Sequence, residues 1–194
     1  MIAIVLTILV LELRVPESLG NQSLAATLEE LRPTLVAWII SFLITGMYWV
    51  AHRDLFSRIM VVNRDVVWLN LLFLLTVSLI PFAASVLGRF DEDPIALRSY
   101  GAVMIVATVM RLLLYWYVVR HPELLWTHER LEKAGIGFAI TAGPLVVYAM
   151  AMAVADYSTS LSVFLYLAVP ILYFLLVTAL RAIRSSRAEA DGFS

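Results

Sequence analysis

Five long apolar runs constrain the fold of this chain more than any other feature of its sequence. Each is close in length to a membrane-spanning helix, which needs roughly 20 apolar residues to cross a hydrocarbon layer of ~30 Å. The apolar residues are continuous rather than alternating, which excludes a transmembrane β-barrel. Pro81, Pro144 and Pro170 lie inside three of the runs and are expected to kink their helices. The runs are Thr34–Ala51, Val66–Gly88, Ser99–Val119, Ala134–Ala155 and Leu161–Leu180.

The composition is that of a chain embedded mostly in lipid. Hydrophobic residues make up 62% of the 194 residues, and charged residues make up only 15%, against about 25% in an average soluble domain. A net charge of −1 gives no basic surface for nucleic acid, and the absence of cysteine excludes disulfides and thiol chemistry. The sequence therefore predicts an all-α, polytopic membrane protein.

The chain opens with a shorter apolar segment, "MIAIVLTILVLEL". No basic residue precedes it and no small-x-small cleavage site follows it, so it is not typical of a secretory signal. Counted as a first helix, it gives a single six-helix domain over residues 1–184 and a short polar cytoplasmic tail over 185–194. We expect the helices at 1–13, 34–58, 66–88, 96–120, 134–155 and 161–183.

Lys and Arg are distributed unequally between the two ends of the helices. Nine lie in the second and fourth connections and the tail, and four lie on the opposite side. Because cytoplasmic connections are enriched in Lys and Arg, both termini are predicted to be cytoplasmic, in the cell (inner) membrane. The pairs Tyr48-Trp49 and Tyr115-Trp116 fall at the predicted cytoplasmic helix ends, as an interfacial aromatic belt requires. The nine are Arg53, Arg58, Arg64, Arg120, Arg130, Lys133, Arg181, Arg184 and Arg187, and the four are Arg14, Arg32, Arg89 and Arg98.

One face of the first helix carries a narrow aliphatic stripe. At about 100° per residue, Ile4, Ile8 and Leu11 lie within roughly 60° of one another, with Thr7 and Glu12 on either side. Residues 1–20 contain no aromatic residue, so this helix lacks the usual interfacial anchors. A polar and an acidic residue beside an aliphatic stripe suit the wall of a pore. The same spacing is also typical of ordinary helix packing, so the pattern alone leaves both interpretations open.

Few residues within the runs can carry chemistry. No acidic residue lies near the middle of a run, which argues against a proton-coupled transporter. No metal-ligand pair, Ser-His-Asp arrangement or phosphate loop is found, so we expect no metal, no cofactor and no enzyme activity. Arg111 is the one charge inside a run, about 13 Å from Arg120 along the helix. It is either a functional charge, a partner of a loop carboxylate such as Asp65, or a partly snorkelling side chain.

Three stretches of the sequence resemble one family. They are "IAIVLTILVLEL" (2–13), "ISFLITGMYWVAHRDLF" (40–56) with its Tyr-Trp-x-x-His element, and "NLLFLLTVSLIPFAASVLG" (70–88) with its Leu-Ile-Pro-Phe element. Over about the first 120 residues the chain resembles the prokaryotic relatives of the endolysosomal potassium channel, the transmembrane-protein-175 family. The resemblance implies a homotetramer of six-helix subunits, with the first helix of each lining a central pore.

The resemblance also implies a function for the aliphatic stripe. A cation channel of this family, favouring K⁺, would pass its ions through aliphatic constrictions rather than a carbonyl-lined filter. The narrowest ring would be Ile4, with Ile8 and Leu11 forming further rings outward and Thr7 supplying a hydroxyl. Glu12 is expected either to concentrate monovalent cations near the outer mouth or to pair with Arg14 or Arg32.

The family's signature, an Arg followed by Phe-Ser-Asp ahead of the stripe, is not present in this sequence. In the family it packs against the inner ends of the second and third helices. This chain has Trp49, His52 and Asn70 there, which we expect to support the inner end of the first helix. We expect either a truncated or misassigned start, or a member that lacks the signature. A non-conducting membrane scaffold and a small-solute transporter are the alternative functions.

Overall fold

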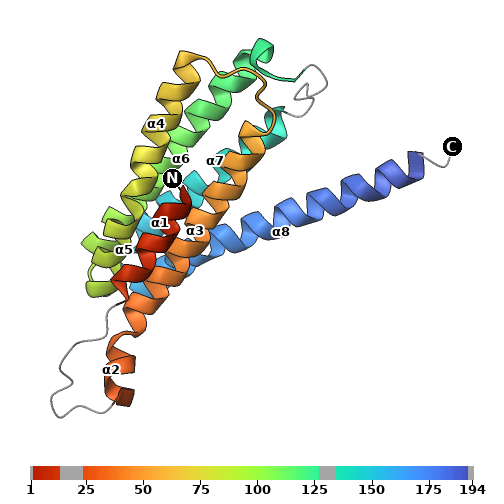
Figure 1. The fold of residues 1–194 in the computed structure, drawn as a ribbon. Helices are drawn as coiled ribbons and strands as arrows, with labels where there is room; N and C mark the ends of the chain where they lie inside the picture. The colour runs from red at the N-terminus through yellow and green to blue at the C-terminus, as the bar shows by residue number, and fades with distance from the viewer. Residues whose placement is uncertain (1, 14–23, 127–133, 192–194) are drawn as a thin grey trace.

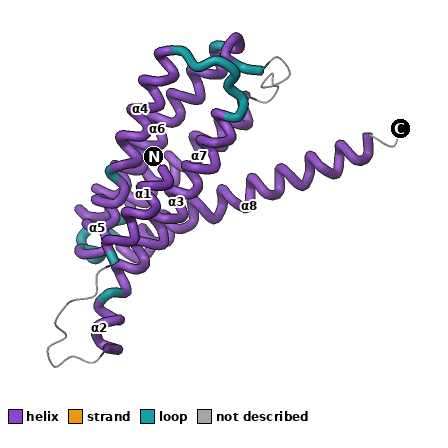
Figure 2. The backbone as a smooth tube through the Cα atoms, viewed as in Figure 1, coloured by secondary structure: helices purple, strands orange, loops and turns teal. Residues whose placement is uncertain are grey.

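Most of the helices pack into one bundle around a shared core (Figure 1). The computed structural model describes residues 2–13, 24–126 and 134–191. In these ranges the chain is helical apart from turns, loops and one isolated β-bridge, as Figure 2 shows for the helices, which confirms the all-α prediction. The elements are α1 (Ile2–Leu9), the 3₁₀ helix η1 (Val10–Glu12), α2 (Leu24–Glu30), α3 (Arg32–Phe56), α4 (Arg64–Ser78), α5 (Ile80–Arg89), α6 (Pro94–Arg120), the 3₁₀ helix η2 (Pro122–Leu124), α7 (Ala134–Val154) and α8 (Thr159–Asp191).

Five helical segments of the described ranges are long and apolar enough to cross a membrane, and they correspond to the five apolar runs. The chain is therefore a multi-pass membrane protein. The segment expected as a sixth spanning helix is helical, but α1 has eight residues and η1 three. Together they rise about 18 Å, which is too short to cross a bilayer. The spans are Arg32–Phe56, Arg64–Arg89, Pro94–Arg120, Gly137–Val154 and Thr159–Ala179.

Most of the expected helix boundaries lie within two residues of the observed ones, α2 was not expected, and two of the expected helices differ more strongly. The helix predicted over 66–88 is two helices, because Pro81 lies in the first turn of α5 and has no backbone N–H to donate to the Val77 carbonyl. Leu79 joins the two helices. The last helix continues past the predicted end at 183 to Asp191, so most of the expected polar tail is helical. Its Arg, Ala and Glu residues are strong helix formers, which explains the extension.

The prolines inside α7 and α8 have a smaller effect. Pro144 and Pro170 lie within continuous helices, where neighbouring helices can satisfy the freed carbonyls. The second half of α8 leaves the bundle in Figure 1. Leu172 and Leu175, near the middle of α8, are strongly exposed. In a membrane this apolar surface is covered by lipid or by another protein surface.

The two connections predicted to be cytoplasmic, after α3 and after α6, are joined by backbone hydrogen bonds. Met60 N donates to Leu124 O at 2.8 Å, and Trp126 N donates to Arg58 O at 3.2 Å. A second, smaller apolar cluster lies under this contact and joins α3, α4 and α6. The connection after α3 therefore holds the connection after α6 by backbone hydrogen bonds.

The aromatic residues at this end divide into inward and outward groups. Trp49 and Trp116 are exposed, whereas the tyrosine before each of them is buried. The Arg53 guanidinium lies 5.3 Å from the Trp49 ring centre, and the Arg120 guanidinium lies 5.1 Å from that of Trp116. A Trp beneath an Arg at the end of a span is the arrangement expected at a membrane interface.

The helices α3 and α5 make a close contact at Gly88. A Cβ atom placed there would lie 2.8 Å from Thr34 Cα, which is backbone and cannot rotate away. Thr34 Oγ1 also donates a hydrogen bond to Gly88 O at 3.2 Å. We therefore expect Gly88→Ala to lower the free energy of unfolding in detergent by about 1–3 kcal/mol, as measured by thermal or chemical unfolding.

Gly46→Ala is the matched control for this substitution. Gly46 lies inside α3, and nothing approaches its Cβ position within 4 Å. Ala favours a helix interior over Gly by about 1 kcal/mol, so this variant should keep or gain stability. Equal losses in the two variants would show that the contact between Gly88 and Thr34 is not a tight one.

Candidate functional site

The helix α1 is anchored by one of its faces. Ile2, Val5 and Leu9 are buried, Leu9 completely, and they contact α3, α4 and α5. Tyr48 of α3 and Phe73 of α4 belong to the same buried core. This packing determines which face of α1 turns away from the core of the subunit.

The predicted aliphatic stripe lies on the exposed side of α1. Ile4, Ile8 and Leu11 expose 60%, 42% and 60% of their surface. Thr7 is exposed on the same side, and its Oγ1 donates a hydrogen bond to Ile4 O at 2.7 Å. The hydroxyl proton is thus used within the helix, while the oxygen lone pairs stay available to a cation. Glu12 ends η1, and its side chain lies outside the described part of the structure.

Two of the three residues expected to support α1 come together. His52 Nε2 donates to Asn70 Oδ1 at 2.8 Å, which joins α3 to α4. The imidazole ring stacks on Phe56 at 4.4 Å and on Phe73 at 5.7 Å between ring centres. Phe73 belongs to the core that holds α1. The pair of His52 and Asn70 is therefore connected to α1 through the Phe73 ring.

Trp49 does not take part in this arrangement. Its side chain is 42% exposed and lies beneath the Arg53 guanidinium, on the surface of α3. The spacing of three residues between Trp49 and His52 predicts a shared face of the helix. The packing of α4 separates them, because His52 turns toward Asn70 and Trp49 turns toward the surroundings.

Arg111 lies against the interior of the subunit. Its Nε atom is buried, and within the described residues no hydrogen-bond partner is found for it. A cavity of about 10 Å³ lies beside it, lined in part by Tyr48, Thr108 and Tyr173, which is close to the smallest volume that holds one water. The expected partner Asp65 instead accepts a hydrogen bond from the Tyr117 hydroxyl at 2.9 Å. The guanidinium thus faces tyrosine and threonine side chains rather than that loop carboxylate.

A set of hydroxyl pairs inside the bundle was not predicted. Ser41 and Tyr100 share a hydrogen bond at 2.9 Å, and Tyr48 and Thr108 share one at 2.8 Å. Tyr166 of α8 donates to a backbone carbonyl of α6 at 2.8 Å. Ser41 and Tyr48 are seven residues apart on α3, and Tyr100 and Thr108 are eight residues apart on α6. Each spacing places the two residues on one face of their helix, and this is the pattern in the sequence that could have predicted the pairs. These bonds join α3, α6 and α8 within one subunit.

The fold is shared with a solved structure. The structure described as a lysosomal potassium-selective channel TMEM175 homolog from Chamaesiphon minutus matches with a TM-score of 0.79 at 22% sequence identity. The match covers 90% of this chain and 90% of that one. The arrangement of the short first helix and the five spans is therefore that of a known helical fold.

The sequence comparisons agree on one family. The family model for the endosomal/lysosomal potassium channel TMEM175 matches residues 1–81, which include every candidate residue except Arg111. A potassium channel of Chryseobacterium sp. (strain P1-3) is 36% identical over 121 residues, or 61% of this chain and 60% of that protein. The endosomal/lysosomal proton channel TMEM175 of Rattus norvegicus is 24% identical over 187 residues, or 93% of this chain.

The alignments span only part of these relatives, 60% of the bacterial protein and 35% of the rat protein. The matched region nevertheless contains α1, both helices that carry His52 and Asn70, and the start of α5. The three stretches on which the resemblance was based lie in or overlap this region. The chain is therefore a prokaryotic relative of the TMEM175 family.

Proposed function

We propose that the chain is one subunit of a homotetrameric cation channel that favours K⁺, with α1 of each subunit lining a central pore. The observation that carries this proposal is the division of α1 into an anchored face and an exposed aliphatic face. An exposed stripe on a helix that is held by its opposite side is the surface that four copies would turn toward a common axis. The match to a bacterial potassium channel gives further support.

In the proposed channel, the aliphatic stripe acts as a hydrophobic constriction. Four copies of Ile4 form the narrowest ring, and Ile8 and Leu11 form further rings outward. An ion must shed water to pass such a short dry segment, so the pore closes by dewetting and opens by a small widening or rotation of α1. Partial dehydration discriminates between K⁺ and Na⁺ less sharply than a fixed ring of carbonyl groups.

Two other functions use the same surfaces differently. In a non-conducting membrane scaffold, the exposed stripe of α1 would pack against a partner helix. A small-solute transporter needs a polar cavity near the middle of the membrane. The cavity beside Arg111, at about 10 Å³, is too small for an organic solute, which favours the channel over the transporter.

Substitution of Ile4 tests the constriction. Ile4→Ala widens the ring and Ile4→Asn hydrates it, so both variants should raise K⁺ flux into liposomes several-fold and lower the preference for K⁺ over Na⁺. The matched control is Ile171→Ala, since Ile171 is 45% exposed on α8. This control should conduct like the wild type.

Unchanged flux and selectivity in both Ile4 variants would show that Ile4 is not the constriction. The oligomeric state of the purified protein separates the channel from the scaffold. A tetramer that passes K⁺ supports the channel, and a protein that passes no K⁺ in any variant favours the scaffold.

The charge of Glu12 gives a separate test of the outer mouth. Four carboxylates at the mouth raise the local cation concentration. Their charge acts over a screening length of about 30 Å at a salt concentration of 0.01 M, but of only about 3 Å at 1 M. Glu12→Gln should therefore reduce K⁺ flux about twofold at the lower salt concentration and leave it unchanged at the higher one. A loss of equal size at both concentrations would contradict this role.

The pair of His52 and Asn70 is proposed to support the inner end of α1. Asn70→Leu removes the hydrogen bond and leaves a half-buried imidazole N–H unpaired, which should cost about 1–3 kcal/mol in the unfolding free energy. Thermal unfolding in detergent measures this loss, and K⁺ flux shows its effect on the pore. Trp49→Leu is the control, because Trp49 is exposed and should change the unfolding free energy little. A similar loss in both variants would argue against a specific role for the pair.

A further inference from the structure

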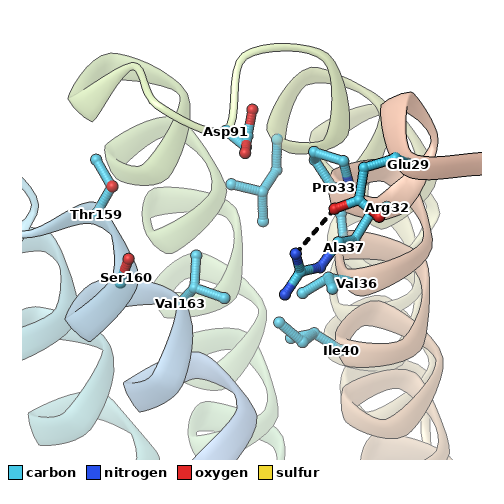
Figure 3. A pocket seen from close by; sticks show the side chains of 11 residues that line it. Glu29, Arg32, Pro33, Val36, Ala37, Ile40, Asp91, Thr159, Ser160 and Val163 are labelled. Carbon is cyan, nitrogen blue, oxygen red and sulfur yellow. Dashed lines mark hydrogen bonds and ion pairs between the residues drawn. The ribbon is translucent and has the colours of Figure 1, made fainter. Parts of the chain in front are cut away.

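A pocket of about 430 Å³ lies at the end of the bundle opposite the tied connections (Figure 3). The start of α3, the end of α5 and the start of α8 line it, together with Glu29 of α2. The segments of α3, α5 and α8 are each an end of a membrane-capable segment, so the pocket lies at the depth where hydrocarbon meets lipid headgroups. Its volume is within the range of about 300–1,000 Å³ that binds small molecules.

The outer part of the pocket is polar and charged. The Arg32 guanidinium extends from α3 into the pocket in Figure 3, and its Nη1 lies 3.1 Å from Glu29 Oε1. Asp91 lies at the outer edge of the pocket, and the hydroxyls of Thr159 and Ser160 lie on the opposite wall, at the start of α8. One guanidinium and two carboxylates give this outer part a formal charge of −1.

The inner part of the pocket is apolar. Val36 and Ile40 continue the wall along α3, about 6 and 12 Å further into the span than Arg32 at 1.5 Å per residue. Val163 lies one turn into α8 on the opposite side. The lining therefore changes from charged to aliphatic along the direction in which a lipid molecule changes from headgroup to acyl chain.

We propose that this pocket binds a glycerophospholipid with a zwitterionic headgroup, of the phosphatidylethanolamine type. The carboxylates of Glu29 and Asp91 would receive the ammonium group. Arg32, with the hydroxyls of α8, would receive the phosphate through charge-assisted hydrogen bonds. An acyl chain would lie against the apolar wall. The formal charge of −1 favours a neutral zwitterion over an anionic phosphatidylglycerol, because like charges repel in this setting. No residue of α1 lines the pocket, so the proposal is independent of ion conduction.

Lipid retention by the full chain tests the proposal. The purified protein in mild detergent is incubated with phosphatidylethanolamine and phosphatidylglycerol that carry the same acyl chains, and bound lipid is counted by native mass spectrometry. The wild type should retain phosphatidylethanolamine in preference to phosphatidylglycerol. Arg32→Gln and Asp91→Asn should each lower that retention about tenfold, since each removes one charged contact to the headgroup. Arg32 is exposed and Asp91 is half-buried, so both variants should fold.

The controls lie at the same end of the bundle but outside the pocket. Arg89→Gln and Glu92→Gln remove the same charges from residues that do not line it, and both should retain lipid as the wild type does. Equal retention of the two lipids by the wild type, or unchanged retention by Arg32→Gln and Asp91→Asn, would overturn the proposal. Displacement of the lipid by soluble glycerophosphoethanolamine at equal concentration would also overturn it, because the ligand would then be a free headgroup compound.

Discussion

The packing of one face of α1 against α3, α4 and α5 determines what the rest of the structure can do. Within a membrane, helices gain little from hydrophobic burial, so close packing decides which faces meet. Ile2, Val5 and Leu9 provide that packing, and they leave Ile4 and Ile8 exposed on the other side. A short helix held in this way has a defined orientation in the subunit, and its exposed face is available to other copies of the chain.

The support beneath α1 is rigid for a different reason. Ser41 with Tyr100, and Tyr48 with Thr108, join α3 to α6 by hydrogen bonds inside the bundle. Lipid cannot replace these bonds, so separating the two helices would leave polar groups unpaired in an apolar medium. Because Tyr48 also belongs to the core that holds α1, the same residue connects the hydroxyl pairs to the packing of α1.

The sequence predicted those features that follow from a single helix. Continuous apolar runs located the spans, and the 100° periodicity placed Ile4, Ile8 and Leu11 on one face of α1. Features that depend on several helices were missed. The separation of Trp49 from His52 is set by α4, and the pocket beside Arg32 is built from three segments far apart in the chain. No local pattern encodes such contacts.

The two kinds of contact in the bundle differ in how easily they shift. The face of α1 that meets the core consists of aliphatic side chains, which can slide past one another without breaking a hydrogen bond. The contacts between α3 and α6 depend on directional hydroxyl pairs such as Ser41 with Tyr100, and the connections at one end are tied by Met60 and Leu124. In the proposed channel, the element that moves most easily is therefore α1, and the frame around it stays in place. A gate of this kind needs only a small rotation of four short helices to change the width of the aliphatic ring.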